Sequence, residues 1–266
     1  MVEGLTSAGR RLALALGLAA VLTGSVQAAE LLADLRERGK LRIAVEGTYP
    51  PFNFRDPKTG QLTGYDVEVA RLVADRLGVK PQFVLTEWSA VLPAVGSGKV
   101  DVAINQVVIT PAREQAFDFS VPYTYSRFQL IVRANERAAY RSLADLRGRV
   151  VGVSHGSVFE EQASAVPGIE VRPYPAAPEN LQDLAFGRID AVLDDSLMVA
   201  YLVRTSQLPL KAGPQVGKVE RVGIVMRKGH PQFRKTIDKI LEDARADGTL
   251  RRISIKWFGD DASRAP

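Results

Sequence analysis

The segment SGKVDVAIN (Ser97–Asn105) decides how the fold is interpreted, because a similar segment, FGRIDAVLD (Phe186–Asp194), occurs later in the chain. Each contains a glycine typical of a helix end, then a basic residue, a β-branched residue, an aspartate and a strand-like apolar run. The sequence LADLR also occurs twice, at Leu32–Arg36 and Leu143–Arg147, shortly before a strand-like run. The spacing is far longer than in a short-period repeat protein. These repeated segments predict two similar α/β lobes with different insertions.

Strand-like and helix-like runs alternate around these segments. LRIAVEG (Leu41–Gly47) is a β-branched, apolar strand pattern. YDVEVARLVADRLG (Tyr65–Gly78) has helical spacing, with Asp66 as its cap and Gly78 as its stop. Further strands are predicted at Gln82–Leu85, Asp101–Ile104, Arg149–Val153, Ile169–Val171 and Ile189–Leu193, and further helices at Ala90–Val95, after Ser157 and at Leu181–Phe186. The alternation predicts the α/β class, with mostly parallel sheets covered by helices.

The N-terminal segment has the pattern of a targeting sequence. Arg10 and Arg11 precede the apolar run LALALGLAAVL (residues 12–22), which is about half the length of a membrane span. Small residues at Val26 and Ala28 then predict a signal peptide over residues 1–28, cleaved after Ala28. The chain has no cysteine, which excludes lipid attachment at an N-terminal cysteine, disulfides and thiolate metal sites. We therefore expect a periplasmic protein that is not a lipoprotein.

Composition argues against several classes of function. The formal net charge is +5, but the basic residues are interleaved with acidic ones, without a basic stripe or an aromatic platform, so no nucleic-acid partner is expected. His155 and His230 are far apart in sequence. The chain has no paired-histidine metal motif, phosphate loop or Gly-x-Ser-x-Gly elbow. We expect neither a metal nor a cofactor.

Polar residues gather where the predicted strands end. In open α/β sheets, ligands bind beyond the carboxyl ends of the strands, where helix N-termini present free N–H groups. The residues at these positions are Glu46, Tyr49 and Phe52, then Asn105, Gln106 and Arg113, then Ser154, His155, Gly156 and Ser157, and finally Asp194 and Asp195. A guanidinium fits a carboxylate in a bidentate manner, and an aspartate does the same for an ammonium. If two lobes face each other, this set fits a small zwitterion.

The chain also resembles the periplasmic solute-binding proteins for polar amino acids (solute-binding protein family 3), the receptors of ATP-driven importers. The resemblance covers nearly the whole mature chain. Its motifs are EGTYPPFNF (Glu46–Phe54), LTGYDVEVA (Leu62–Ala70), ITPAREQAFDFSVPY (Ile109–Tyr123), VGVSHGS (Val151–Ser157), GRIDAVLDD (Gly187–Asp195) and ADGTLRRISIKWFG (Ala246–Gly259). EGTYPP, INQV and PYT are most similar to the cystine-binding branch.

This resemblance implies a two-lobed periplasmic binding protein fold of type II. Residues 29–123 and 222–266 would form lobe 1, and residues 124–221 would form lobe 2. Two crossover strands would join the lobes, near Pro122–Arg127 and Lys218–Gly223. Trp257 and Phe258 would pack on lobe 1 where the C-terminal segment returns to it.

The resemblance also implies the role of each site residue. Arg113 would bind the ligand α-carboxylate, assisted by the backbone N–H of Val108 and by Ser157 at a helix N-terminus. The adjacent Gly156 is also expected to bind the ligand. Asp195 would bind the α-ammonium. The pocket for the ligand side chain would be formed by Tyr49, Phe52 and Trp88. The distal end of a longer ligand would be contacted by Glu46 together with Asn105 or Gln106.

Several positions allow a second interpretation. Asp195 could cap the helix that follows, leaving Asp194 to bind the ammonium. Trp88 could belong to the core, and Glu46 could be a solvated strand end. Tyr49 and Phe52 could simply pack against the turn at Pro50 and Pro51. Val108 stands where relatives carry Ser or Thr, so one hydrogen bond to the carboxylate is lost and the identity of the ligand is left open.

The predicted function is an extracytoplasmic receptor that closes on a polar amino acid, with cystine favoured, and delivers it to a membrane-embedded ABC permease. A monomer is expected. The alternative is an enzyme of the same fold, such as a prephenate or arogenate dehydratase, in which Glu46 or a lobe 2 carboxylate would serve as the general acid.

Overall fold

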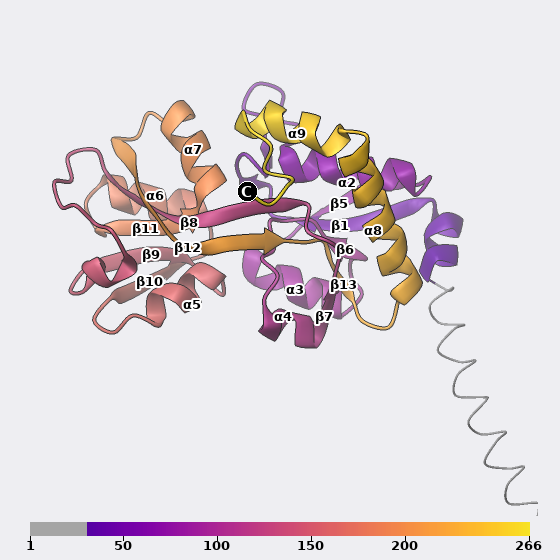
Figure 1. The fold of residues 1–266 in the computed structure, drawn as a ribbon, viewed down its shortest axis with the longest axis horizontal. Coiled ribbons are helices and arrows are strands. Elements are labelled where there is room, and N and C mark those ends of the chain that lie inside the picture. The colour runs from indigo at the N-terminus through magenta and orange to yellow at the C-terminus, as the bar shows by residue number, and fades with distance from the viewer. Residues whose placement is uncertain (1–30) are drawn as a thin grey trace, which may run out of the picture.

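The computed structural model describes residues 31–266 and places their strands in two five-stranded sheets and one small three-stranded sheet (Figure 1). The first sheet has the order β5 (Lys80–Leu85), β1 (Lys40–Val45), β6 (Val102–Ala103), β13 (Val225–Arg227), β7 (Phe117–Phe119). The second has the order β10 (Glu170–Tyr174), β9 (Val150–Ser154), β11 (Ala191–Asp195), β8 (Thr124–Arg133), β12 (Leu210–Val222). The small sheet has the order β2 (Thr48–Tyr49), β3 (Asn53–Arg55), β4 (Leu62–Thr63).

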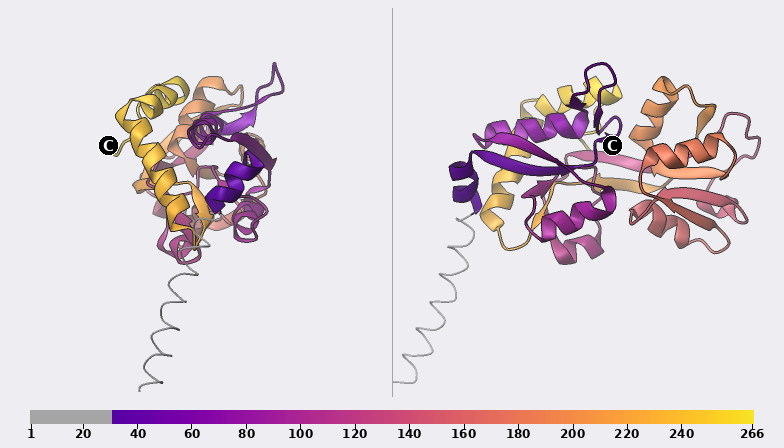
Figure 2. Two further views of the ribbon diagram at one scale, coloured as in Figure 1. Left: turned by 90° about the vertical axis from the view of Figure 1, so that its right-hand side faces the viewer. Right: turned by 180° about the vertical axis from the view of Figure 1, so that it is seen from behind.

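Helices flank each large sheet, so the molecule has two α/β lobes (Figures 1 and 2). Around the first sheet lie α2 (Tyr65–Arg76), α3 (Trp88–Gly96), α4 (Pro111–Ala116), α8 (Pro231–Ala246) and α9 (Thr249–Phe258). Around the second lie α5 (Val158–Ser164), α6 (Ala177–Ala185), α7 (Ser196–Thr205) and a short 3₁₀ helix at Leu143–Leu146. The predicted two-lobed α/β fold is confirmed.

Strands β8 and β12 run side by side from one lobe into the other (Figure 1). They pair in antiparallel fashion, with Thr124 opposite Val222 and Ser126 opposite Glu220. The two predicted crossover segments thus lie against each other at the junction of the lobes. The predicted lobe boundaries fall at the start of β8 and the end of β12 and stay a prediction.

Both large sheets are mostly parallel, as expected, and each contains one strand that runs against the other four. In the first sheet β1 is parallel to β5 and β6, whereas β13 is antiparallel to β6 and β7. In the second sheet β9 is parallel to β10 and β11, whereas β8 is antiparallel to β11 and β12. The reversed strand is β13 in the first sheet and β8 in the second. In the second sheet β8 enters lobe 2 and β12 leaves it next to β8, so the two run in opposite directions.

Helix α2 follows the predicted apolar spacing, but its cap differs from the prediction. Gly64 is the N-cap, with a φ of 128°, and an added Cβ would lie 2.2 Å from the carbonyl oxygen of Phe52. That oxygen accepts a hydrogen bond from the Asp66 amide. The Asp66 side chain is instead fully buried and accepts hydrogen bonds from Tyr123 and Asn53. The stop at Gly78 agrees with its φ of 74°, because glycine adopts this conformation without strain.

The C-terminal helices return to the first lobe, as the resemblance implied. The Phe258 ring lies 4.7 Å from the Tyr65 ring, and the Trp257 ring contacts Phe54 edge-on at 5.9 Å. The predicted signal peptide and its cleavage site lie outside the described residues. Within residues 31–266, no helix combines the length and the apolar character that crossing a membrane requires.

Candidate functional site

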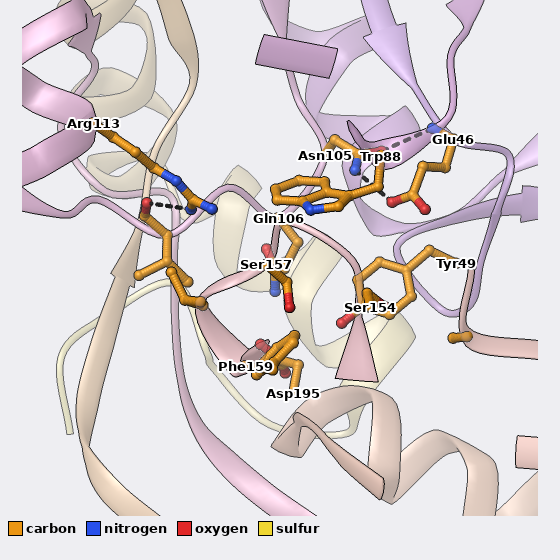
Figure 3. A pocket seen from close by; sticks show the side chains of 13 residues that line it. Glu46, Tyr49, Trp88, Asn105, Gln106, Arg113, Ser154, Ser157, Phe159 and Asp195 are labelled. Carbon is orange, nitrogen blue, oxygen red and sulfur yellow. Dashed lines mark hydrogen bonds between the residues drawn. The ribbon is translucent and has the colours of Figure 1, made fainter. Parts of the chain in front are cut away.

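A cavity lies at the ends of strands from both lobes (Figure 3). The predicted site residues that line it are Glu46, Tyr49, Trp88, Asn105, Gln106, Val108, Arg113, Ser157 and Asp195. Residues from the ends of β1 and β6 therefore meet residues from the ends of β9 and β11. Trp88 combines the two interpretations, because its indole forms part of the cavity wall and the residue also packs against a core cluster of the first lobe (Figure 3).

Arg113 supplies a positive charge to the cavity. It lies in α4, whose N-cap Thr110 accepts a hydrogen bond from the Arg113 amide. Its guanidinium donates to the carbonyl oxygen of Val108 at 3.0 Å and stacks over the Trp88 ring at 5.4 Å. Burial lowers the pKa of Arg113, yet a guanidinium stays charged in proteins. Arg113 makes no ion pair within residues 31–266, so most of its donors are available to an anionic ligand.

Val108 lies beside this guanidinium in an isolated bridge with Val222. The hydrogen bonds of the bridge are donated by the amides of Ile109 and Gly223, so the bridge does not use the Val108 amide. The Val108 side chain is 4% exposed and has no polar atom. At this point of the wall the chain offers a backbone N–H but no hydroxyl.

Asp195 both lines the cavity and caps a helix, so the two interpretations of this residue are compatible. One carboxylate oxygen accepts from the Leu197 amide at the start of α7, at 2.8 Å. The other accepts from the Ser126 hydroxyl on β8, at 2.6 Å. Burial raises the pKa of Asp195 to about 6. The carboxylate is thus fixed in place and faces a cavity in which a cation would favour its charged form.

Asp194 has a different environment and does not line the cavity. Its Oδ1 accepts from the Tyr49 hydroxyl at 2.5 Å and from the Asp195 amide at 2.7 Å. The first bond connects β2 of one lobe to β11 of the other. Burial raises the pKa of Asp194 to about 7.

Glu46 and Asn105 form a reciprocal pair on the first lobe. The Asn105 side-chain amide donates to Glu46 Oε2 at 2.7 Å, and the Glu46 backbone amide donates to Asn105 Oδ1 at 2.8 Å. Burial raises the pKa of Glu46 to about 7, against the opposing effect of the bond from Asn105. Glu46 is half-buried at the cavity, so it is not a fully solvated strand end. Its second carboxylate oxygen remains available on the cavity side (Figure 3).

Gln106 has an unusual backbone and an unsatisfied side chain. Its φ is 51°, and it is the one non-glycine residue with positive φ in residues 31–266. Its amide donates to the hydroxyl of Tyr123 at 3.2 Å. The side chain is buried, and neither its oxygen nor its nitrogen has a partner within the described chain. Buried amides are normally hydrogen-bonded, so this side chain indicates a ligand or water in the cavity.

Two predicted site residues do not line the cavity. Phe52 is fully buried in the core, where its ring lies 5.0 Å from Tyr49 and 5.8 Å from Phe258. The close approach of Gly64 to the Phe52 backbone draws this residue inward. Gly156 has a φ of 72°, and its amide donates to the side chain of Glu160. Only the neighbouring Ser157 reaches the cavity, and its hydroxyl caps α5.

Three lining residues were not predicted, namely Val158, Phe159 and Ala177, whereas Ser154 was expected at a strand end but was given no ligand role. Ser154 ends β9, and Ala177 opens α6 just after β10, so the strand-end rule that selected the other positions also points to these two. Val158 and Phe159 are apolar residues in the first turn of α5, and Phe159 packs edge-on against Phe128 at 5.1 Å. Sequence alone does not separate such residues from the core.

The wall therefore offers a guanidinium and a backbone N–H at one end, and carboxylates and an amide elsewhere. An α-amino acid has the complementary groups. No group of three or more possible metal ligands occurs within residues 31–266.

Two α/β lobes connected by paired strands, with a charged cavity between them, define a bilobal solute-binding protein. The chain belongs to the bacterial extracellular solute-binding proteins, family 3, whose model matches residues 41–260. It is 38% identical over 235 residues to the L-cystine-binding protein TcyJ of Escherichia coli K12 (88% of each chain). It is 36% identical over 236 residues to the L-cystine-binding protein TcyA of Bacillus subtilis (88% of this chain, 87% of that one).

A similar solved structure is that of AncCDT-1, an ancestral amino acid-binding protein described as a precursor of cyclohexadienyl dehydratase. The TM-score is 0.81 at 32% identity, over 86% of this chain and 99% of that one. These findings confirm the predicted family and fold. The two relatives are named as binding proteins rather than enzymes.

Proposed function

We propose that this protein is an extracytoplasmic receptor that encloses an amino acid, with cystine as the favoured ligand, and delivers it to an ABC permease. The single observation that carries this proposal is the placement of opposite charges around one cavity between the lobes. Arg113 comes from the first lobe and Asp195 from the second. Neither residue has an ion-pair partner within residues 31–266.

The backbone end of the ligand would bind between these two residues. Its α-carboxylate would accept from the Arg113 guanidinium, from the Val108 amide and from Ser157. Its α-ammonium would donate to Asp195. Each charge-assisted hydrogen bond contributes about 1.5–3 kcal/mol net, and micromolar affinity requires about 8 kcal/mol. Four or five such bonds are sufficient once the entropy of binding is subtracted.

The rest of the cavity supports a ligand with a second polar end. Glu46 presents a carboxylate oxygen, and the Gln106 amide has a free donor and a free acceptor. Cystine carries a second ammonium and a second carboxylate, which match these two groups. The names of TcyJ and TcyA favour the same ligand.

Delivery would use closure of the two lobes about β8 and β12. A ligand that touches both lobes favours the closed form to the extent that it binds that form better. The closed, monomeric receptor would then be presented to the permease after export of the mature chain.

An enzymatic role is the alternative, and Glu46, with its pKa raised to about 7 by burial, is the side chain suited to general acid catalysis. The binding-protein names of the relatives favour the receptor. Incubation of the protein with prephenate and arogenate, followed by chromatography, should yield no aromatic product. Turnover of either compound would favour the enzyme.

The receptor proposal is tested by calorimetric titration of the mature protein with L-cystine. We expect saturable binding to the wild-type protein and loss of at least about 100-fold in affinity for Arg113→Met, because that variant leaves the ligand carboxylate without its cation. Arg127→Met is a matched control, since Arg127 is a half-buried residue of β8 that does not line the cavity and donates to the Gly217 carbonyl. It should bind like the wild type. Unchanged affinity in Arg113→Met would refute this binding mode.

A further inference from the structure

Asp66 is a buried carboxylate that neither the proposed ligand contacts nor the cap of α2 uses. Its side chain is fully buried at the start of α2, and it forms no ion pair within residues 31–266. Burial raises its pKa to about 7, although the hydrogen bonds from Tyr123 and Asn53 oppose this rise. A buried carboxylate without a cation is costly to stability, so charge pairing does not explain its presence.

Two chains of hydrogen bonds converge on this carboxylate. In the first, the Gln106 amide donates to the Tyr123 hydroxyl at 3.2 Å, and that hydroxyl donates to Asp66 Oδ1 at 2.8 Å. In the second, the Gly47 amide donates to Asn53 Oδ1 at 2.8 Å, and the Asn53 side-chain amide donates to Asp66 Oδ2 at 3.2 Å. Each oxygen of the carboxylate therefore ends one chain.

Both chains begin at the wall of the cavity. Gln106 lines the cavity itself, and Gly47 directly follows the lining residue Glu46 (Figure 3). These two segments follow different strands, β6 and β1, and Asp66 lies on neither strand. Asp66 does not line the cavity, so any effect that it has on a ligand passes through these segments.

The direction of the hydrogen bonds explains why position 66 requires a carboxylate. A backbone N–H can only donate, so the Tyr123 hydroxyl and the Asn53 side chain must accept from the wall and donate inward. The last group must therefore accept from both chains, and an ionised aspartate accepts at both of its oxygens. An asparagine at position 66 has one acceptor and one donor group, so it can complete only one of the two chains.

The first chain also holds an unfavourable backbone conformation in place. Gln106 has a φ of 51°, a left-handed conformation that is strained for a residue with a side chain. Its side chain lines the cavity and has no partner for either polar atom within the described chain. Without the Tyr123 hydroxyl the residue would relax toward a more favourable backbone conformation, and its side-chain amide would move.

We propose that Asp66 is a positioning residue that fixes two wall segments of the first lobe, residues 46–47 and 105–106, in the arrangement that binds the ligand. It acts through Tyr123 and Asn53 and does not touch the ligand. This inference rests on the proposed receptor function and adds residues of the core to it. The first lobe holds its recognition groups from within its own core, so they are preorganised before a ligand enters.

The first test is amide hydrogen exchange of the ligand-free protein, followed by NMR at pH 8, where the Asp66 carboxylate is largely ionised. Tyr123→Phe should speed exchange of the Gln106 amide by at least about tenfold and leave that of Gly47 unchanged. Asn53→Ala should give the reverse pattern. Asp66→Asn should speed exchange of at least one of the two amides. If Asp66→Asn does not fold, the other two variants carry the test.

The second test is calorimetric titration with L-cystine at pH 8. Tyr123→Phe should weaken binding by about fivefold to tenfold, because the side-chain amide of Gln106 is no longer held in place. In a Gln106→Gly background the same change should have little further effect, since that background keeps the backbone conformation but lacks the amide. A merely structural role of Tyr123 would give equal losses in both backgrounds.

Tyr65→Phe is the matched control. Tyr65 is also fully buried, its ring stacks on that of Tyr123 at 5.9 Å, and its hydroxyl donates to the Tyr123 carbonyl oxygen at 2.8 Å. This hydroxyl belongs to neither chain. The variant should therefore lose stability in urea unfolding to a similar extent as Tyr123→Phe, while it keeps the wild-type affinity and the wild-type exchange rates at Gly47 and Gln106.

The outcomes separate this inference from the receptor function. If Tyr123→Phe folds and keeps the wild-type affinity and the wild-type exchange rate at Gln106, the positioning role is refuted while the receptor function stands. Equal losses of affinity in the wild-type and Gln106→Gly backgrounds would refute it as well. If the wild type binds no cystine, the receptor function fails for that ligand, whereas unchanged exchange rates in Tyr123→Phe and Asn53→Ala would still refute the two chains.

Discussion

In both lobes, a glycine with positive φ follows a helix and an aspartate then holds the start of a neighbouring strand. Gly98 follows α3 with a φ of 74°, and Gly187 follows α6 with a φ of 76°. Asp101 accepts from the Arg42 amide on β1 at 2.8 Å, and Asp190 accepts from the Val150 amide on β9 at 2.9 Å. The repeated sequence therefore forms the same structural unit in both lobes, a joint in which Asp101 or Asp190 holds the start of a neighbouring strand.

The lobes differ in the residues that follow this joint. In the first lobe the strand is followed by Asn105, Gln106 and eventually the cationic Arg113. In the second lobe it ends in Asp194 and Asp195. One lobe thus presents a cation and amides, and the other presents carboxylates. The scaffold therefore fixes where a side chain at the strand end will lie. The identity of that side chain decides whether the lobe binds the carboxylate or the ammonium of a zwitterion.

The joints also differ in strength. The Asp101 side chain is fully buried and lies 2.7 Å from the Arg42 guanidinium and 3.1 Å from that of Arg38. The Asp190 side chain is 26% exposed, and its arginine partners lie at 3.7 and 3.9 Å. Buried, well-aligned pairs lose more when one partner is removed than solvent-exposed ones.

The largest effect is expected at Asp195, on the lobe that supplies carboxylates. Asp195→Ala should weaken cystine binding by at least about 100-fold, because it leaves the ligand ammonium unpaired. It should also lower the free energy of unfolding by about 1 kcal/mol, because α7 loses its N-cap. Asp195→Asn keeps an oxygen for the Leu197 amide and should lose affinity with little loss of stability. Calorimetry and urea unfolding measure the two effects, and wild-type affinity in both variants would contradict the assignment.

The second prediction compares the two joints directly. Asp101→Asn should lower the free energy of unfolding by about 3 kcal/mol, and Asp190→Asn by about 1 kcal/mol or less. Burial alone would raise the pKa of Asp101, but the hydrogen bonds and charges of Arg42 and Arg38 hold it below its usual value. Its stabilisation is therefore present above the unfolded pKa of about 3.9 and is lost as the pH falls below it. Equal losses in the two variants, in urea unfolding at pH 7, would show that the joints are equivalent.

The third prediction concerns pH and the unequal charges of the two lobes. The raised pKa values of Asp195, Asp194 and Glu46 mean that the ligand-free protein holds protons that the unfolded chain releases between about pH 4 and pH 7. Stability without ligand should fall as the pH rises through this window. Affinity for an ammonium-bearing ligand should instead rise, by about tenfold between pH 5.5 and pH 8, because the carboxylates lose their protons. Calorimetry over this range checks the sign, and affinity that falls with rising pH would contradict it.

The smallest effect is expected at Val108, on the lobe that supplies the cationic Arg113. Val108→Thr would place a hydroxyl beside Arg113 and should raise affinity by about threefold to tenfold, through one added hydrogen bond of about 0.5–1.5 kcal/mol. Val108→Ala adds no hydroxyl and serves as the control. Parallel calorimetric titrations distinguish the two. A gain in both variants would point to relief of crowding instead of a new bond.

Much of this arrangement could be predicted from the sequence. Strand ends are local features, so the repeated segments are sufficient to locate Asn105 and Asp194, and with them the adjacent Gln106 and Asp195. Asp66 was misassigned as a cap because its environment depends on Tyr123, which is distant in the chain. Phe52 was misassigned for a similar reason, since only the packing against Phe258 and the path of Gly64 draw it inward.

The mostly parallel sheets were predicted from the sequence, but the single reversed strand in each was not. Alternation of strands and helices indicates parallel pairing, but β8 and β12 are crossover strands whose antiparallel pairing depends on how the lobes connect. Val158 and Phe159 could not be recognised as lining residues, because an apolar residue in the first turn of a helix is equally compatible with the core.

The backbone of Gln106 has a consequence for engineering this protein. A left-handed conformation costs a non-glycine residue about 1 kcal/mol, and the chain keeps it at the residue whose free amide faces the cavity. A design procedure that optimises stability alone would choose glycine at position 106. The redesigned protein would melt at a higher temperature and would lack the amide, so its improved stability would conceal the loss of a recognition group.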